Sequence, residues 1–313
     1  MDHREAIVAL RQFLSSQILG QDRLIERLLI ALLADGHMLV EGAPGLAKTR
    51  AIKELAEGLE AEFHRIQFTP DLLPADITGT EIYRPETGSF VFQQGPIFHN
   101  LVLADEINRA PAKVQSALLE AMAERQVSVG RSTYDLPPLF LVMATQNPIE
   151  QEGTYPLPEA QLDRFLMQID VTYPDMATER RIILETTGGV SAEVKQAMNA
   201  DELMAAQRLV RRLPVGDSVV EAILKLVRSA RPGEGDPGIA GLLSWGPGPR
   251  AGQALMLAVR ARALIQGRVA PSLDDVAALA EPVLKHRMAL TFAARAEGET
   301  LAAIIAKLVT RLT

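Results

Sequence analysis

The sequence predicts two domains, an α/β domain built on a parallel sheet and a following domain made of helices. Up to about Tyr173, apolar runs of strand length alternate with helical stretches, a pattern typical of a parallel sheet flanked by helices. After Tyr173 the apolar residues recur only at helical spacing, and 313 residues are enough for two domains. We therefore place the domains at residues 1–173 and 174–313.

Five apolar runs are the predicted strands of the sheet, and two segments are predicted hairpins. The runs span residues 38–40, 63–68, 101–104, 139–144 and 166–171. Residues 81–92 and 126–136 each have two β-prone arms around a turn that contains glycine, which indicates projecting hairpins. In the second domain, helical periodicity covers residues 203–213, 219–230, 249–265, 273–285 and 300–312, with a polar loop at 231–238.

The loop Gly42-Ala43-Pro44-Gly45-Leu46-Ala47-Lys48-Thr49 has the composition of a phosphate-binding loop. It follows the run at 38–40 and opens a helix that has Ile52, Leu55 and Leu59 at helical spacing. Backbone N–H groups in such a loop face an anion, the lysine neutralises outer phosphates, and the hydroxyl can bind Mg²⁺. An ordinary strand-to-helix turn is the alternative interpretation.

Ala47 departs from the usual loop pattern, which has glycine directly before the lysine. Alanine accepts helical backbone angles but resists the positive φ that glycine allows. We therefore expect the loop to enter its helix one residue earlier than the usual pattern requires.

Two carboxylates follow the apolar run at 101–104, where an open α/β sheet places its ligand-facing groups. Asp105 is predicted to hold Mg²⁺ through water, and Glu106 to orient or deprotonate the water that attacks a terminal phosphate. The alternative is that both acids simply cap the next helix.

Three other polar residues complete the predicted site. Asn147 follows an apolar run and could bond the terminal phosphate or the attacking water. Arg164 precedes the last predicted strand and could reach a neighbouring subunit's nucleotide in a ring. Arg250 falls in the first turn of a helix, after Pro249, where a cation opposes the helix dipole and so indicates an anionic neighbour.

Composition excludes several classes of protein and site. There is no cysteine, which excludes disulfides and thiolate sites and fits a reducing cytoplasm. A net charge of −7 with 4% aromatic residues disfavours a nucleic-acid surface. We expect no membrane span, because the apolar stretches fall far short of about 18 residues. We expect no export signal, because the polar N-terminus runs into an amphipathic pattern without an apolar signal core or a small-residue cleavage site. The five histidines lie in different elements without ligand spacing, so the only metal we expect is Mg²⁺ with nucleotide.

Taken together, the motifs resemble the MoxR branch of the AAA+ ATPases over essentially the whole chain. The segments that carry the resemblance are residues 42–49, 68–79, 105–111, 144–148, 157–165 and 248–251. Relatives also tend to have alanine before the loop lysine, so Ala47 is a mark of this branch. The resemblance implies a P-loop AAA+ core with β-hairpin insertions, the helix-2 and pre-sensor insertions of the clade, followed by an all-helical lid domain.

The resemblance also implies a role for each matching residue. It assigns Gly42 through Arg50 to the nucleotide-binding Walker A segment, with Lys48 catalytic and Thr49 a metal ligand. It assigns Asp105 and Glu106 to Walker B, as metal ligand and catalytic base.

The resemblance further makes Asn147 sensor 1, Arg164 the arginine finger and Arg250 sensor 2. Leu19, Gly20 and Gln21 would lie against the adenine. Arg109 is a second candidate for a contact between subunits.

Relatives imply ATP hydrolysis with Mg²⁺ in a hexameric ring that remodels, matures or metal-activates a client enzyme complex. A partner with a von Willebrand factor A domain is also implied. Two other functions stay open, a nucleic-acid motor on the same core and a nucleotide-gated scaffold that hardly hydrolyses ATP.

Overall fold

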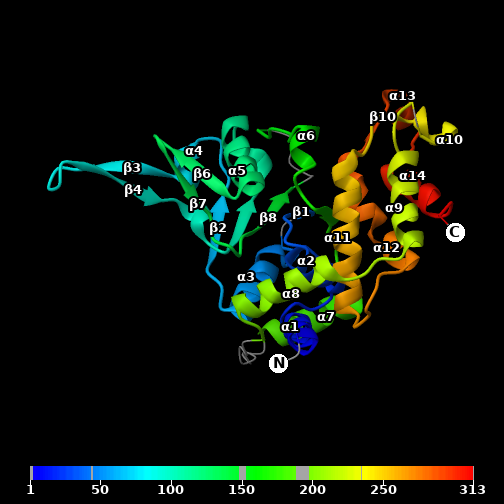
Figure 1. The fold of residues 1–313 in the computed structure, drawn as a ribbon, viewed down its shortest axis with the longest axis horizontal. Helices are drawn as coiled ribbons and strands as arrows, with labels where there is room; N and C mark the ends of the chain where they lie inside the picture. The colour runs from blue at the N-terminus through cyan, green and yellow to red at the C-terminus, as the bar shows by residue number, and fades with distance from the viewer. Residues whose placement is uncertain (1–2, 44, 148–152, 188–196, 234, 313) are drawn as a thin grey trace. The chain divides into compact units, whose positions relative to one another are not determined.

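The computed structural model describes residues 3–43, 45–147, 153–187, 197–233 and 235–312, and these form two compact units (Figure 1). Unit 1 comprises residues 1–28, 37–164 and 169–204. Unit 2 comprises residues 29–36, 165–168 and 205–313. The boundary that the sequence predicts after Tyr173 stays a prediction.

Unit 1 is built around a five-stranded sheet of strand order β2-β5-β8-β1-β9. The strands are β1 (Met38–Glu41), β2 (Phe63–Gln67), β5 (Leu101–Asp105), β8 (Leu141–Gln146) and β9 (Met167–Asp170). The pairs β1/β8, β2/β5 and β5/β8 are parallel, which confirms the predicted fold class. The carboxyl ends of these strands therefore meet at one edge of the sheet.

Helices connect the strands because the chain must cross over between parallel neighbours. Those that begin in unit 1 are α1 (His3–Gln17), α2 (Asp22–Leu33), α3 (Lys48–Leu59), α4 (Pro74–Thr78), α5 (Ala112–Glu124), α6 (Glu159–Leu162), α7 (Met176–Thr187) and α8 (Ala200–Arg212). Single 3₁₀ turns occur at Pro96–Phe98 and Ile107–Arg109. Strand β5 is fully buried through residue 104, so its polar end at Asp105 lies where the core stops.

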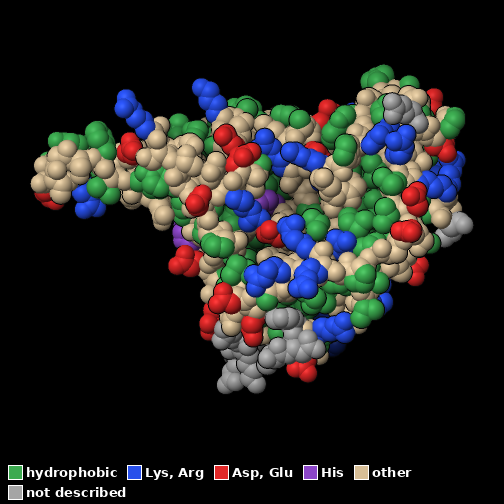
Figure 2. Space-filling view, viewed as in Figure 1, with side chains coloured by type: hydrophobic (Ala, Val, Ile, Leu, Met, Phe, Trp, Pro, Cys, Tyr) green, Lys and Arg blue, Asp and Glu red, His purple; other side chains and the backbone are tan. Residues whose placement is uncertain are grey.

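Both predicted hairpins are present. Strands β3 (Gly79–Arg84) and β4 (Ser89–Gln94) pair antiparallel, as do β6 (Gln126–Val129) and β7 (Ser132–Asp135). The β3–β4 hairpin extends away from the rest of unit 1 (Figure 1), and its surface includes hydrophobic side chains (Figure 2). Phe92 of this hairpin stacks on Tyr134 of the other, with ring centroids 3.9 Å apart.

Unit 2 is mostly helical, as predicted. Its helices are α9 (Asp217–Ser229), α10 (Pro237–Ala240), α11 (Pro249–Ile265), α12 (Leu273–Leu284), α13 (Phe292–Ala296) and α14 (Leu301–Val309), with a 3₁₀ turn at Lys285–Arg287. Helical periodicity did not predict the short antiparallel pair β10 (Leu243–Trp245) and β11 (Ala289–Leu290), nor α10, which begins at the end of the expected loop.

A buried arginine fastens three parts of unit 2 together. Arg287 is 2% exposed, and its guanidinium donates to the backbone carbonyls of Phe165, Leu166 and Val283 at 2.6, 3.1 and 2.6 Å. Because an unbonded buried guanidinium would be costly, these carbonyls are required neighbours of residue 287. None of the helices described here is both long and apolar enough to span a bilayer.

Candidate functional site

The glycine-rich loop lies between β1 and α3, the position that the sequence predicts. Gly42 N–H donates to the Gln146 carbonyl at 3.3 Å, and a Cβ on Gly42 would lie 2.7 Å from the Val171 carbonyl oxygen. No other residue fits there without a backbone shift. The predicted ligand residue Pro44 lies outside the described residues.

Ala47 corrects the expectation that the loop enters its helix early. Its backbone is left-handed, with φ 59° and ψ 15°, and helix α3 begins only at Lys48. Alanine therefore adopts a backbone conformation that favours glycine. The left-handed region costs an L-residue about 1–2 kcal/mol, so the loop stores strain directly before its lysine.

Lys48 is half-buried among carboxylates. Its ammonium donates to the Gly42 carbonyl at 2.6 Å. Burial lowers the pKa of Lys48, and the negative charges of Asp105, Glu106 and Glu41 partly oppose this shift. The charges of the two predicted Walker B acids therefore act on this ammonium.

Thr145 joins the two acids at the end of β5. Its hydroxyl donates to Asp105 Oδ1 at 2.5 Å and accepts the Glu106 N–H at 2.9 Å. Glu106 has φ 57° and ψ 49°, so this non-glycine residue is also left-handed. The Thr145 contact fixes this strained turn, and neither acid caps a helix with its side chain.

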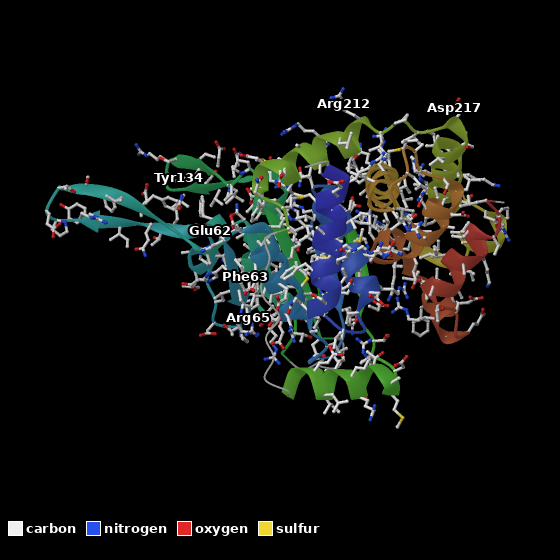
Figure 3. All side chains as sticks on the ribbon, turned by 90° about the horizontal axis from the view of Figure 1, so that it is seen from below. Glu62, Phe63, Arg65, Tyr134, Arg212 and Asp217 are labelled. Atoms are coloured by element: carbon white, nitrogen blue, oxygen red, sulfur yellow. The ribbon has the colours of Figure 1, made fainter. Side chains whose placement is uncertain are left out.

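Three further side chains contact the acids, namely Arg65 and Gln67, which belong to no recognised motif, and Arg109 of the matching segment 105–111. Arg65, labelled in Figure 3, donates to Asp105 Oδ2 through Nε at 3.0 Å and Nη2 at 2.6 Å. Gln67 Nε2 donates to Glu106 Oε2 at 2.9 Å, and Arg109 Nε lies 3.0 Å from the same oxygen. The sequence offered one signal for Arg65 and Gln67, because alternate residues of a strand share one face. Only the pairing of Gln67 with Asp105 in the β2/β5 register shows that these side chains lie beside the acids.

The remaining predicted residues of unit 1 lie at the end of β8, after α6 and on α3. Asn147 follows β8 and is 8% exposed. Arg164 follows α6, and its Nη1 donates to the Leu119 carbonyl at 2.6 Å, so the guanidinium is anchored on its own subunit. Arg50 forms an i,i+4 ion pair with Glu54 on α3.

The segment Leu19-Gly20-Gln21 joins α1 to α2 and packs against residues 172–178. Gly20 has φ 73°, and a Cβ there would lie 2.2 Å from Thr178 Cγ2. The Gln21 side chain donates to the Thr172 carbonyl at 3.4 Å. Arg250 belongs to unit 2, where it is exposed in the first turn of α11 as predicted. Its approach to a nucleotide stays a prediction.

The oxygen ligands suit Mg²⁺, a hard cation that is usually held by one or two protein oxygens together with phosphates. Thr49 and Asp105 offer a hydroxyl and a carboxylate of this kind. Elsewhere, within the ranges described above, no group of three or more histidines, aspartates or glutamates could hold a metal ion. The structure brings His64 and His99 together, with ring centroids 4.8 Å apart, although they are distant in sequence.

Comparisons with known proteins match both parts of the chain. A family model described as "ATPase family associated with various cellular activities (AAA)" matches residues 37–167, and an "AAA lid domain" model matches residues 239–308. These matches cover the loop, both acids, Asn147 and Arg164 in the first case, and Arg250 in the second.

Similar proteins cover most of the chain. Chaperone MoxR1 of Mycobacterium tuberculosis is 47% identical over 283 residues, which is 90% of this chain and 74% of that protein. Protein MoxR of Methylorubrum extorquens is 33% identical, over 92% of this chain and 89% of that protein. A crystal structure of a candidate ATPase from Cytophaga hutchinsonii superposes with a TM-score of 0.91 at 40% identity, covering 99% of this chain and 95% of the other.

Proposed function

The chain belongs to the MoxR family of AAA+ ATPases, and we propose that it hydrolyses ATP between the subunits of a ring to remodel a client protein complex. The observation that carries the proposal is the pair Asp105 and Glu106, which Thr145 links. The negative charges of both acids act on the ammonium of Lys48. The two acids lie at the edge of a parallel sheet where ligands bind.

Each residue of the site has one proposed task. The loop from Gly42 to Arg50 wraps the phosphates, and Lys48 neutralises their charge. Thr49 and Asp105 hold Mg²⁺, which when bound neutralises charge that builds on the phosphate oxygens.

Glu106 accepts a proton from the attacking water, and Asn147 orients that water. Leu19, Gly20 and Gln21 contact the adenine. Arg250 contacts the phosphates from the lid.

The arrangement around Glu106 also determines when the proposed base can act. Its Oε2 accepts from Gln67 and lies against the Arg109 guanidinium, so two donors hold the carboxylate. The oxygen that would accept the proton is thus already engaged by both side chains. At least one of these contacts must therefore loosen before the proposed proton transfer.

Glu106→Gln tests the proposed hydrolysis. We expect ATP turnover to fall by 10²-fold or more, which is about 2.7 kcal/mol of barrier, while ATP binding is retained because the loop is unchanged. Phosphate release and binding of a fluorescent ATP analogue are the two measurements. Equal turnover of wild type and variant would exclude Glu106 as the base.

Arg164 is proposed to act on the nucleotide of a neighbouring subunit. The bond from Nη1 to the Leu119 carbonyl fixes the position of the guanidinium, and its other N–H groups can still donate to a second partner. Arg164→Ala subunits, inactive alone, should regain turnover when mixed with Lys48→Ala subunits, which supply an arginine but bind ATP poorly. Absence of rescue at every mixing ratio would argue against a contact in trans.

The ring is proposed to be a hexamer whose β3–β4 and β6–β7 hairpins contact a client or a partner with a von Willebrand factor A domain. The exposed hydrophobic residues of the first hairpin support this role, namely Ile82, Tyr83, Phe90 and Val91. Affinity capture with the Glu106→Gln form in ATP tests it. Capture that survives when Tyr83 and Phe90 are changed to serine would exclude this hairpin as the contact.

A slowly hydrolysing, nucleotide-gated scaffold is the second candidate function. The observation in its favour is the double hold on Glu106 by Gln67 and Arg109. A single-turnover experiment separates the two functions, because a scaffold retains ATP without releasing phosphate.

A further inference from the structure

Arg65 belongs to none of the nucleotide motifs, yet its guanidinium bonds the carboxylate proposed to hold Mg²⁺. Nε and Nη2 both donate to Asp105 Oδ2, at 3.0 and 2.6 Å. The Asp105 side chain is 14% exposed and the Arg65 side chain is 49% exposed. The half-exposed guanidinium of Arg65 therefore covers the mostly buried carboxylate of Asp105.

The second oxygen of Asp105 is also bonded, since Oδ1 accepts the Thr145 hydroxyl at 2.5 Å. The Thr145 contact is part of the strained Glu106 turn, because the same hydroxyl accepts the Glu106 N–H. Thr145 is 1% exposed and fixed within β8, whereas Arg65 has solvent beside it. When a cation or its bound water approaches Asp105, the Arg65 contact is the one that can give way.

We propose that Arg65 is a positioning residue that occupies Asp105 in the nucleotide-free chain and that Mg²⁺ displaces when it arrives with ATP. This inference rests on the proposed function. Two cations compete for one oxygen, so Arg65 sets how much Mg²⁺ the site needs. It also keeps the buried carboxylate paired while no metal is present, which avoids the cost of an unpaired buried charge.

The same displacement reaches Glu106 through Gln67. Arg65 Nη2 donates to Gln67 Oε1 at 2.8 Å, and Gln67 Nε2 donates to Glu106 Oε2 at 2.9 Å. Hydrogen bonds thus connect the proposed metal ligand Asp105 to the proposed base Glu106 through the side chains of Arg65 and Gln67. When Arg65 leaves Asp105, Gln67 loses the donor that orients its amide, and its hold on Glu106 weakens. Arrival of Mg²⁺ is thereby coupled to release of the base.

Binding rather than turnover tests the inference. A fluorescent, non-hydrolysable ATP analogue is held at fixed concentration and Mg²⁺ is titrated into the wild type and Arg65→Gln. We expect the half-saturating Mg²⁺ concentration to fall by about three- to tenfold in Arg65→Gln, the size of a lost charge-assisted pair at a half-exposed position. Arg65→Lys keeps the charge without the paired donors, so its half-saturating Mg²⁺ concentration should lie between those of the wild type and Arg65→Gln.

Lys53→Gln is the matched control for net charge, because Lys53 is an exposed cation on α3 paired with Glu57. An equal shift in this control would overturn the inference in favour of a general charge effect. So would an unchanged or higher Mg²⁺ requirement in Arg65→Gln or, should that variant not fold, in Arg65→Lys. A wild type that binds no analogue at any Mg²⁺ concentration would instead overturn the proposed function, and this inference with it.

Discussion

The carboxyl and amino edges of the central sheet differ in the polar groups that they hold, although the same strands form both. At the carboxyl edge, Ala47 and Glu106 are left-handed, and each of the two acids is paired with an arginine, Asp105 with Arg65 and Glu106 with Arg109. At the amino edge, neutral polar side chains hydrogen-bond the backbone between strands. Asn100 accepts the Glu62 N–H and donates to the Leu139 carbonyl, and His37 lies between Met122 and Val142. Left-handed residues occur at both edges, since Asp35 and Glu60 precede β1 and β2. The difference between the edges therefore lies in the acids and their paired cations at the carboxyl edge, where the proposed chemistry needs them, while hydrogen bonds at the opposite edge stabilise the fold.

Acid should lower the free energy of unfolding through His37, at the amino edge of the sheet. Burial, followed by the charge of Arg125, lowers the pKa of His37 from 6.5 to about 3. The unfolded chain therefore binds a proton below pH 6.5 that the folded chain refuses until about pH 3, so stability present above pH 6.5 is lost as the pH falls. The loss is about 2 kcal/mol by pH 5 and approaches about 5 kcal/mol near pH 3.

Denaturant unfolding of wild type and His37→Gln across this pH range measures the effect. Glutamine can donate to the Met122 carbonyl and accept the Val142 N–H without titrating. The variant should lose less stability than the wild type as the pH falls. Parallel stability curves would contradict the assignment of this loss to His37.

Thr145→Val should damage the carboxyl edge in both function and stability. Valine has nearly the same shape but leaves the Glu106 N–H and Asp105 Oδ1 without the hydroxyl. We expect the free energy of unfolding to fall by about 2–3 kcal/mol and ATP turnover to fall by about tenfold or more because the turn loosens. Thr145→Ser, which keeps the hydroxyl, is the control and should retain most of both.

Asn100→Ala should show the contrast, because it removes two hydrogen bonds far from the acids. The expected loss in the free energy of unfolding is about 1–2 kcal/mol, with the affinity for ATP analogues unchanged. A tenfold change in that affinity would mean that the two edges are coupled.

Ala47→Gly should have the smallest effect and the opposite sign. Relief of the left-handed strain outweighs the extra freedom of glycine in the unfolded chain by about 1 kcal/mol or less. Unfolding by denaturant should therefore show a small gain, whereas Ala117→Gly in the middle of α5 should cost about 1 kcal/mol. A loss at both positions would argue against a left-handed Ala47.

The sequence predicted the strands and the residues at their ends because hydrophobic runs and motif spacing are local signals. The run at 101–104 became β5 almost unchanged, and the run at 139–144 became a strand at 141–146. Backbone strain at Ala47 was predicted wrongly, since the closing of the loop outweighs the local preference of alanine. Arg65 and Gln67 were missed because their contacts come from strand register, which no local pattern encodes.

The buried contacts of Arg287 have a consequence for how the chain can be divided and assembled. Its guanidinium bonds carbonyls of Phe165 and Leu166, about 120 positions earlier in the chain. A fragment that starts at residue 174 would lack these acceptors and would bury a charged side chain without them. The helical unit is therefore not separable by a single cut. During synthesis, the carbonyls of Phe165 and Leu166 cannot make these contacts until residue 287 has been added to the chain.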